Sequence, residues 1–188
     1  MLILHPFTGL RPEDEKETWD FLKDLQTMLL MREKVGLGHD EIIHRKMGVE
    51  NGHPRTAYVD FIRDYWDGTD DLIILEDDKV PTLKDFVDLM HCPEKFCCFP
   101  YPMLSLVVCD MDYWRDIRPF TLGFVKFSKE VQQALPAEQW LPDIPDKPSL
   151  YPFAPVDMMI EKPLTAKLGD YHLHETPIKH NHPVRREK

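Results

Sequence analysis

The chain has 188 residues, of which 33 are acidic and 23 basic, giving a formal net charge of −10 at pH 7. A chain of this length suits one domain with a sizeable core, so residues 1–188 are predicted to form a single domain. The negative charge argues against a nucleic acid or an anionic membrane as the main partner, because both are bound through basic surfaces. No apolar run is long enough to span a membrane and no signal-peptide pattern opens the chain, which predicts a soluble, cytoplasmic protein.

The first third of the chain is predicted to form a strand, a loop and a helix. Residues 2–4 (Leu-Ile-Leu) are a short apolar run typical of a buried strand. The loop over residues 5–12 contains two prolines and a glycine, and the acidic residues after Pro12 indicate a helix start. This helix is expected to run to about Lys34 and to end before Gly36. In a parallel sheet the loop would lie at the carboxyl end of the first strand.

A second strand and a second helix are expected next. Ile42 and Ile43 indicate a short strand within the polar segment 36–55. From about residue 54, apolar residues recur at the spacing of a helix that packs one face on a sheet, beginning with Ala57.

The following strand ends in an acidic turn. Residues 72–75 (Leu-Ile-Ile-Leu) form a continuous apolar run, which is typical of a strand buried on both faces. Glu76, Asp77 and Asp78 come directly after it, and Pro81 prevents continuation. In open α/β sheets, ligands bind in the crevice outside the carboxyl ends of the strands. Adjacent carboxylates repel one another unless a cation joins them, and oxygen ligands without thiolates favour Mn²⁺ or Mg²⁺.

This segment resembles the DXD region of GT-A-fold glycosyltransferases in its apolar strand, its Glu-Asp-Asp sequence and the proline that follows. The resemblance implies an α/β fold, GT-A-like (Rossmann-like), with a mostly parallel sheet flanked by helices. It also implies a Mn²⁺ or Mg²⁺ ion that bridges the diphosphate of a nucleotide-sugar. Asp78 would bind the metal directly, while Glu76 and Asp77 would lie behind it or contact the ribose and sugar. A solvated acidic turn without a ligand is the alternative.

The resemblance implies further contacts to the donor. In such enzymes the loop after the first strand surrounds the base and ribose, which assigns Thr8 and Arg11 to nucleotide binding. A basic residue at the start of the helix before the acidic strand, here Arg55, would reach the nucleotide-sugar. Ordinary surface positions are the alternative for both arginines.

Later segments alternate between strands and helices. Thr82 is predicted to cap a helix over residues 83–90, and residues 96–101 and 104–109 are apolar enough for strands. Asp110-Met111-Asp112 is a second D-x-D sequence, ranked behind the first because it lacks a third carboxylate.

Residues 121–127 read as another strand, with Ser128 capping the next helix. The resemblance implies that Gly123 lets the donor sugar or the acceptor approach the backbone. The alternative is that its missing Cβ makes room for a neighbouring side chain.

Seven of the 17 prolines lie between Pro136 and Pro163. They predict an irregular acceptor loop over about residues 136–156. Asp157 follows, two residues after Pro155, in the first turn of an expected helix. The resemblance to inverting enzymes makes Asp157 the general base for the acceptor hydroxyl. An acidic residue is also favoured there by the helix dipole alone, which is the alternative.

The tail over residues 171–188 holds four of the nine histidines. His172 and His174 alternate with a leucine, so on a strand they face the same side. The resemblance implies that a C-terminal histidine completes the metal shell, and His180 and His182 are the candidates. Solvated histidines in a frayed terminus are the alternative.

The four cysteines do not predict a metal site by their spacing. Cys92, Cys97 and Cys98 have the pattern C-x4-C-C, which is not that of a zinc finger or ribbon, and Cys109 adds no regular spacing. Buried, reduced thiols are predicted instead.

The sequence therefore favours a metal-dependent, inverting glycosyltransferase that moves a sugar from a UDP- or GDP-sugar to an unknown acceptor hydroxyl. A nucleotidyltransferase is the first alternative, although such enzymes carry a basic, glycine-rich triphosphate loop and residues 5–12 hold one glycine and one arginine. A non-enzymatic acidic metal-binding or assembly protein is the second.

Overall fold

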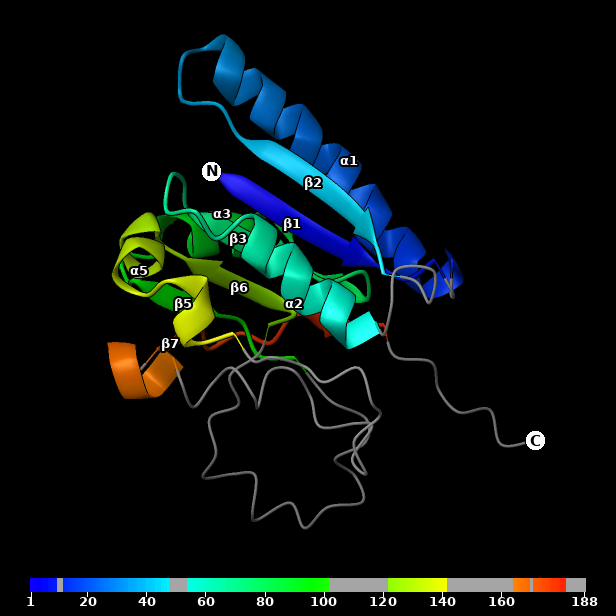
Figure 1. Ribbon diagram of the computed structural model, residues 1–188. Coiled ribbons are helices and arrows are strands. Elements are labelled where there is room, and N and C mark those ends of the chain that lie inside the picture. The colour runs from blue at the N-terminus through cyan, green and yellow to red at the C-terminus, as the bar shows by residue number, and fades with distance from the viewer. Residues whose placement is uncertain (10–11, 48–53, 102–121, 142–163, 170, 182–188) are drawn as a thin grey trace, which may run out of the picture.

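A six-stranded mixed sheet forms the centre of the protein, and helices cover both of its faces (Figure 1). The computed structural model describes residues 1–9, 12–47, 54–101, 122–141, 164–169 and 171–181. The strand order is β2-β1-β3-β6-β5-β7. These strands are β1 (Leu2–Phe7), β2 (Glu41–Lys46), β3 (Leu72–Leu75), β5 (Phe96–Cys98), β6 (Phe124–Phe127) and β7 (His172–Leu173). A separate two-stranded ribbon pairs β4 (Lys79–Val80) with β8 (Lys179–His180).

The pairing within the sheet is mostly parallel. Strand β1 runs parallel to both β2 and β3, and β5 runs parallel to β7. Strand β6 is antiparallel to its two neighbours, β3 and β5. The predicted α/β fold, a mostly parallel sheet flanked by helices, is confirmed.

The helices divide between the two faces of the sheet. Their bounds are α1 (Pro12–Lys34), α2 (Pro54–Asp64), α3 (Leu83–His91), α5 (Lys129–Ala134) and the 3-10 helix η3 (Ala137–Gln139). Helices α1 and α3 pack with one set of buried strand residues, and α2 and α5 pack with the other. The sheet is therefore the middle of three layers.

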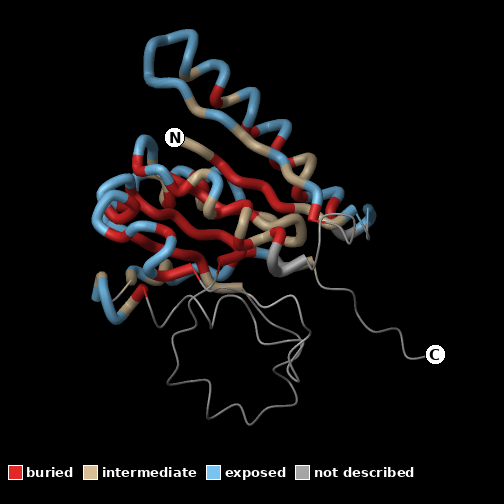
Figure 2. Tube along the Cα trace, in the orientation of Figure 1, coloured by how far each residue is buried: buried red, intermediate tan, exposed pale blue. Residues whose placement is uncertain are grey.

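Alternation of side chains along the strands produces these two cores. On β3, Leu72 and Ile74 point towards α2, whereas Ile73 and Leu75 point towards α1 and α3. All four are at most 1% exposed, and the central strands are buried along their length (Figure 2). A continuous apolar run is what a strand with two buried faces requires, which is why this strand was predictable.

Two predicted helix caps are present. The Thr82 side chain accepts a hydrogen bond from the Asp85 N–H, and the Asp85 carboxylate accepts one from the Thr82 N–H, which completes a capping box on α3. The Ser128 hydroxyl accepts from the Val131 N–H at the start of α5.

Two other expectations need adjustment. Part of the proline-rich segment is regular, because η3 lies within it and Trp140 is buried; residues 142–156 lie outside the described residues. The C-terminal segment is folded as far as residue 181, since β7 joins the main sheet and Ile178 is 3% exposed. Among the described helices, none is long and apolar enough to cross a membrane.

Candidate functional site

The acidic turn lies at the carboxyl end of β3, where the loop after β1 also arrives. Strands β1 and β3 are parallel neighbours, so the segments that leave their carboxyl ends meet at one edge of the sheet. The backbone N–H of Glu76 donates to the Gly123 carbonyl at 2.9 Å, which brings the segment before β6 to the same place. Residues predicted from three separate parts of the sequence are therefore neighbours.

Thr8 holds the first loop against the acidic turn. Its backbone N–H donates to Asp77 Oδ2 at 2.8 Å, and its hydroxyl lies 3.1 Å from the same oxygen. The hydroxyl also lies 3.0 Å from Oε1 of Glu15, which is 4% exposed in the first turn of α1. Because one hydroxyl has one proton, it cannot donate to both carboxylates at once.

Asp77 is therefore a carboxylate in an unfavourable position for its charge. Burial raises its pKa from 3.8 to about 6, against the opposing effect of the Thr8 N–H, and the nearby Asp78, Glu15 and Glu76 raise it further. Burial and like charge both favour the protonated form. Asp77 thus titrates near neutral pH and remains mainly ionised at pH 7.

Lys79 supplies a buried positive charge to the acidic turn. Its side chain is 3% exposed, its Nζ lies 3.1 Å from Glu76 Oε2, and it donates a hydrogen bond to Asp78. The Nζ also lies 4.2 Å from the centre of the Tyr101 ring, a cation–π distance. Burial by itself would lower the pKa of Lys79, but the charges of Glu76 and Asp78 outweigh it and raise the pKa. The ammonium therefore stays charged.

Gly123 is explained by packing in this cluster. A Cβ built at Gly123 would lie 2.6 Å from Lys79 Cε, 2.8 Å from Tyr101 Cε1 and 3.0 Å from Glu76 Oε2. No real Cβ makes such contacts. The geometry favours the packing explanation for this glycine, because its missing side chain makes room for Lys79.

The ribbon of β4 and β8 brings the C-terminal segment to the acidic turn. Lys79 pairs with His180 across the ribbon, and the Asn181 N–H donates to the Asp78 carbonyl at 2.8 Å. Lys179 forms an ion pair with Glu17 on α1, which holds β8 from the other side. The backbone of His180 thus lies beside the Asp78–Lys79 peptide, although its side chain is outside the described part of the structure.

Of four other predicted site residues, the structure describes the backbone of one and none of the other three. Arg55 lies in the first turn of α2, and its side chain is outside the described part of the structure. Arg11, Asp157 and His182 lie outside the described residues.

Sequence reasoning missed three members of this cluster: Glu15, Lys79 and Tyr101. A lysine beside three acidic residues reads as part of a solvated turn. Its burial depends on Tyr101 and Gly123, which are distant in sequence, so no local pattern reveals it. Glu15 carried a weak signal, as a carboxylate in the first turn of a helix that begins beside the site.

Comparison with known proteins establishes neither a family nor a function. No protein-family model matches the chain, and no curated protein sequence is detectably similar. The similar solved structures include A197 from STIV, at 16% identity and a TM-score of 0.37 over 81% of this chain and 76% of that one. They also include a glycosyltransferase involved in the glycosylation of the major capsid of PBCV-1, at 11% identity and a TM-score of 0.40 over 92% of this chain and 80% of that one. Both likenesses are remote, and neither carries over a substrate or a site residue.

Proposed function

We propose that this protein is a metal-dependent glycosyltransferase that uses a nucleotide-diphosphate sugar as donor. The observation that carries the proposal is the cluster of Glu76, Asp77 and Asp78 at the carboxyl end of the central strand β3. The loop after β1 and the strand β8 both border this cluster. Ligand sites of open α/β sheets occur at this edge.

The residues present fit a divalent cation. Lys79 pairs with Glu76 and Asp78, and Asp77 lies against Thr8, so these three carboxylates exceed the one ammonium by two negative charges. The donors are hard oxygen atoms, which suit Mn²⁺ or Mg²⁺. The Asp78 and Glu76 side chains are 32% and 24% exposed, so both remain accessible to an ion from solvent.

Each residue then has a distinct part in the proposal. Asp78 would hold the metal with help from Glu76 and from His180 or His182, and a bound metal would supply positive charge to a leaving diphosphate. Thr8 and Asp77 form the wall of the nucleotide site, to which Arg11 and Arg55 add positive charge. Lys79 fixes the orientation of Glu76 and Asp78.

Asp157 takes the proton of the acceptor hydroxyl as that oxygen attacks the anomeric carbon, so the reaction inverts.

Thermal unfolding with a panel of ligands tests the proposal against its two alternatives. A ligand that binds the folded state raises stability, by about 2.7 kcal/mol at a hundredfold excess over its Kd. We expect the melting temperature to rise with UDP, GDP or their sugar conjugates, and only when Mn²⁺ or Mg²⁺ is present. A rise with nucleoside triphosphates and none with diphosphate sugars would favour the nucleotidyltransferase. A rise with metal alone that no nucleotide increases would favour the non-enzymatic metal-binding protein.

A further inference from the structure

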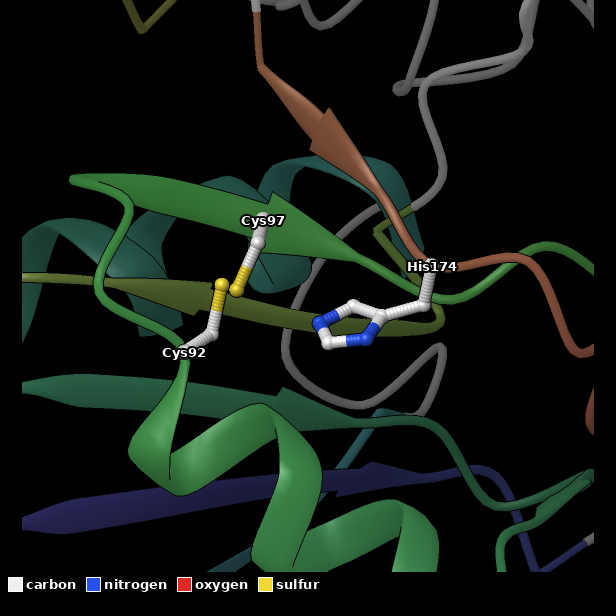
Figure 3. Close-up of side chains that lie close together, drawn as sticks. All are labelled: Cys92, Cys97 and His174. Carbon is white, nitrogen blue, oxygen red and sulfur yellow. The ribbon is translucent and has the colours of Figure 1, made fainter.

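A second cluster of metal-binding side chains lies away from the acidic turn, at the β7 edge of the sheet. Cys92 ends α3, Cys97 lies on β5 and His174 follows β7. One ligand atom from each, the two sulfurs and an imidazole nitrogen, lie within 4.8 Å of one another. Figure 3 shows the two sulfur atoms side by side, with the His174 ring directed towards them.

The fold brings these residues together through the parallel pairing of β5 and β7. Cys97 is the register partner of His172, so the two lie on the same face of the sheet. His174 is two residues further along and therefore shares that face. Cys98 points to the opposite face and packs in the other core.

The His174 ring is held in position by two contacts. It stacks on Phe99 with 4.1 Å between ring centres and 5° between planes. Its backbone N–H donates to the Cys98 carbonyl at 3.0 Å. The ring is thus oriented before any ligand arrives.

His172 lies outside this group of three and is a candidate for the fourth ligand. Its Nδ1 lies 3.1 Å from the sulfur of Cys92, and its ring centre lies 4.6 Å from that of His174. Its side chain is on the exposed side of the cluster, where an ion can enter. A surface pocket lined in part by Cys92, Lys95 and Lys126 opens beside it.

Two observations favour a ligand at this cluster. The Nε2 atom of His174 is buried and has no hydrogen-bond partner among the described residues. Buried polar atoms without partners are uncommon in folded proteins, and each needs an explanation. Cys92 and Cys97 are both buried free thiols, although their sulfur atoms are neighbours.

We propose that Cys92, Cys97, His172 and His174 form a structural zinc site. Two thiolates and two imidazoles are a ligand set of tetrahedral Zn²⁺ in proteins. Bonds of about 2.0–2.3 Å to a tetrahedral ion place ligand atoms roughly 3.3–3.8 Å apart, so Cys92, Cys97 and His174 need only small side-chain movements. The exposed His172 ring has to turn towards them. On binding, the ion replaces the two thiol protons, which pass to solvent, and the two thiolates balance its charge.

Lys126 is a cation beside this site. It is 3% exposed, and its ammonium donates to the Cys92 carbonyl rather than to a carboxylate. Burial raises the pKa of the Cys97 thiol, and the Lys126 charge acts in the opposite direction with a smaller effect. Lys126 also disfavours a metal centre with a net positive charge. A centre of Zn²⁺ and two thiolates is neutral and so avoids this repulsion.

Two other uses of these cysteines fit less well. A nucleophilic cysteine needs a lowered pKa, whereas burial and the neighbouring Cys92 raise the pKa of Cys97. A disulfide between Cys92 and Cys97 would leave both histidines and the unpartnered His174 Nε2 unexplained.

A bound zinc ion would stabilise the edge of the sheet at β7. Strand β7 has two residues and lies at the edge, and its hydrogen bonds join it only to β5 among the described strands. The ion would connect it to the end of α3 as well. The segment after β7 continues through Ile178, whose N–H donates to the Pro100 carbonyl, to Asn181 beside the acidic turn.

The test is zinc binding by the full chain, purified in reductant, stripped of metal and titrated with Zn²⁺ alone. We expect one tightly bound zinc per chain and a rise in melting temperature. Replacing Zn²⁺ by Co²⁺ should give the visible bands of a tetrahedral ion and a thiolate charge-transfer band in the near ultraviolet. Absence of stoichiometric binding, or a Cys92–Cys97 disulfide formed in preference to zinc binding, would overturn the proposal.

Point variants identify the ligands. Cys92→Ser, His172→Ala and His174→Ala should each weaken zinc affinity by at least about tenfold, since even residues behind metal ligands cost 10–100-fold. Cys98→Ser, on the opposite face, should retain the affinity and the cobalt spectrum. Since His172 is exposed, its variant keeps the fold, so unchanged affinity there would refute the four-ligand site. Equal losses in Cys98→Ser would show that the effects come from general destabilisation and would also refute it.

Discussion

At the residue scale, Asp77 combines a buried carboxylate with a pKa near neutrality. A buried charge lowers the free energy of unfolding. Residues of this kind are expected at positions where catalysis or binding requires them. The hydrogen bond from the Thr8 N–H needs only an acceptor oxygen, which an asparagine amide also offers. The hydrogen bond from Thr8 therefore does not require the negative charge of Asp77.

We predict that Asp77→Asn stabilises the protein, and more at about pH 7.5 than at about pH 5. The folded-state pKa of Asp77, about 6, lies above its ordinary value of 3.8, so the folded state binds more protons between these values. Stability of the wild type therefore falls as pH rises through this range, and asparagine removes that loss. The gain should be of the order of 1–3 kcal/mol by denaturant unfolding. Asp88→Asn, an exposed carboxylate on α3, is the control, and a pH-independent difference for Asp77→Asn would contradict the assignment.

Lys79 is the second residue whose role is visible only in the folded protein. Its ammonium is surrounded by Glu76, Asp78 and the Tyr101 ring. Removing one partner of a buried ion pair leaves the other charge without compensation.

We predict that Lys79→Met destabilises the protein, and that Mn²⁺ recovers part of the loss. Breaking a buried pair costs about 3–5 kcal/mol, and less here because both carboxylates are partly exposed. Lys84→Met, which breaks an exposed pair with Asp88, is the matched control and should change stability by about 0–1 kcal/mol. Urea unfolding with and without Mn²⁺ measures both. If Mn²⁺ stabilises neither the wild type nor Lys79→Met, the acidic turn does not bind the ion.

At the scale of secondary-structure elements, the ribbon of β4 and β8 is the feature that the site depends on most. Truncating the chain after Pro177 would remove the buried Ile178 together with β8, and would disturb folding as well as binding. A side-chain replacement is therefore the cleaner experiment.

We predict that His180→Ala keeps the fold and weakens Mn²⁺ binding by at least about tenfold. The β4–β8 pairing uses backbone atoms, so alanine can maintain it. Lys179→Ala, its neighbour on β8, removes a surface ion pair with Glu17 and should leave metal affinity unchanged. Equal affinity of His180→Ala and wild type would remove His180 from the metal shell and leave His182 as the candidate.

The elements that the sequence predicts are those with a local signal. The apolar run 72–75, the capping residues Thr82 and Ser128 and the long helix after Pro12 each carry their signal within a few neighbouring residues. The zinc-type cluster has no such signal, because Cys92 and its neighbour His172 are 80 residues apart in sequence. The same is true of Lys79, which looks solvated until the fold surrounds it.

At the scale of the whole molecule, the proposed transferase needs an acceptor base as well as a donor site. Asp157 is predicted to be that base, and it would touch neither the metal nor the nucleotide. Binding and chemistry should therefore separate in a variant at this position.

We predict that Asp157→Asn leaves donor affinity nearly unchanged and slows turnover by about 10²–10⁴-fold. Asparagine keeps the shape of the side chain and removes its basic oxygen. Hydrolysis of the nucleotide-sugar by water can be followed in place of transfer, and Asp143→Asn serves as a control from the same segment. Turnover at the wild-type rate would mean that the base lies elsewhere or that the enzyme is a retaining one.

Titration calorimetry of the wild type and Asp78→Asn with UDP or GDP, with and without Mn²⁺, tests the central claim most directly. We expect the wild type to bind one of these nucleotides only with the metal. Asp78→Asn should lose at least about tenfold in affinity while unfolding at a similar temperature, because Lys79 retains its contact with Glu76. Nucleotide binding that needs no metal, or equal affinity in the two proteins, would contradict a metal site at the end of β3.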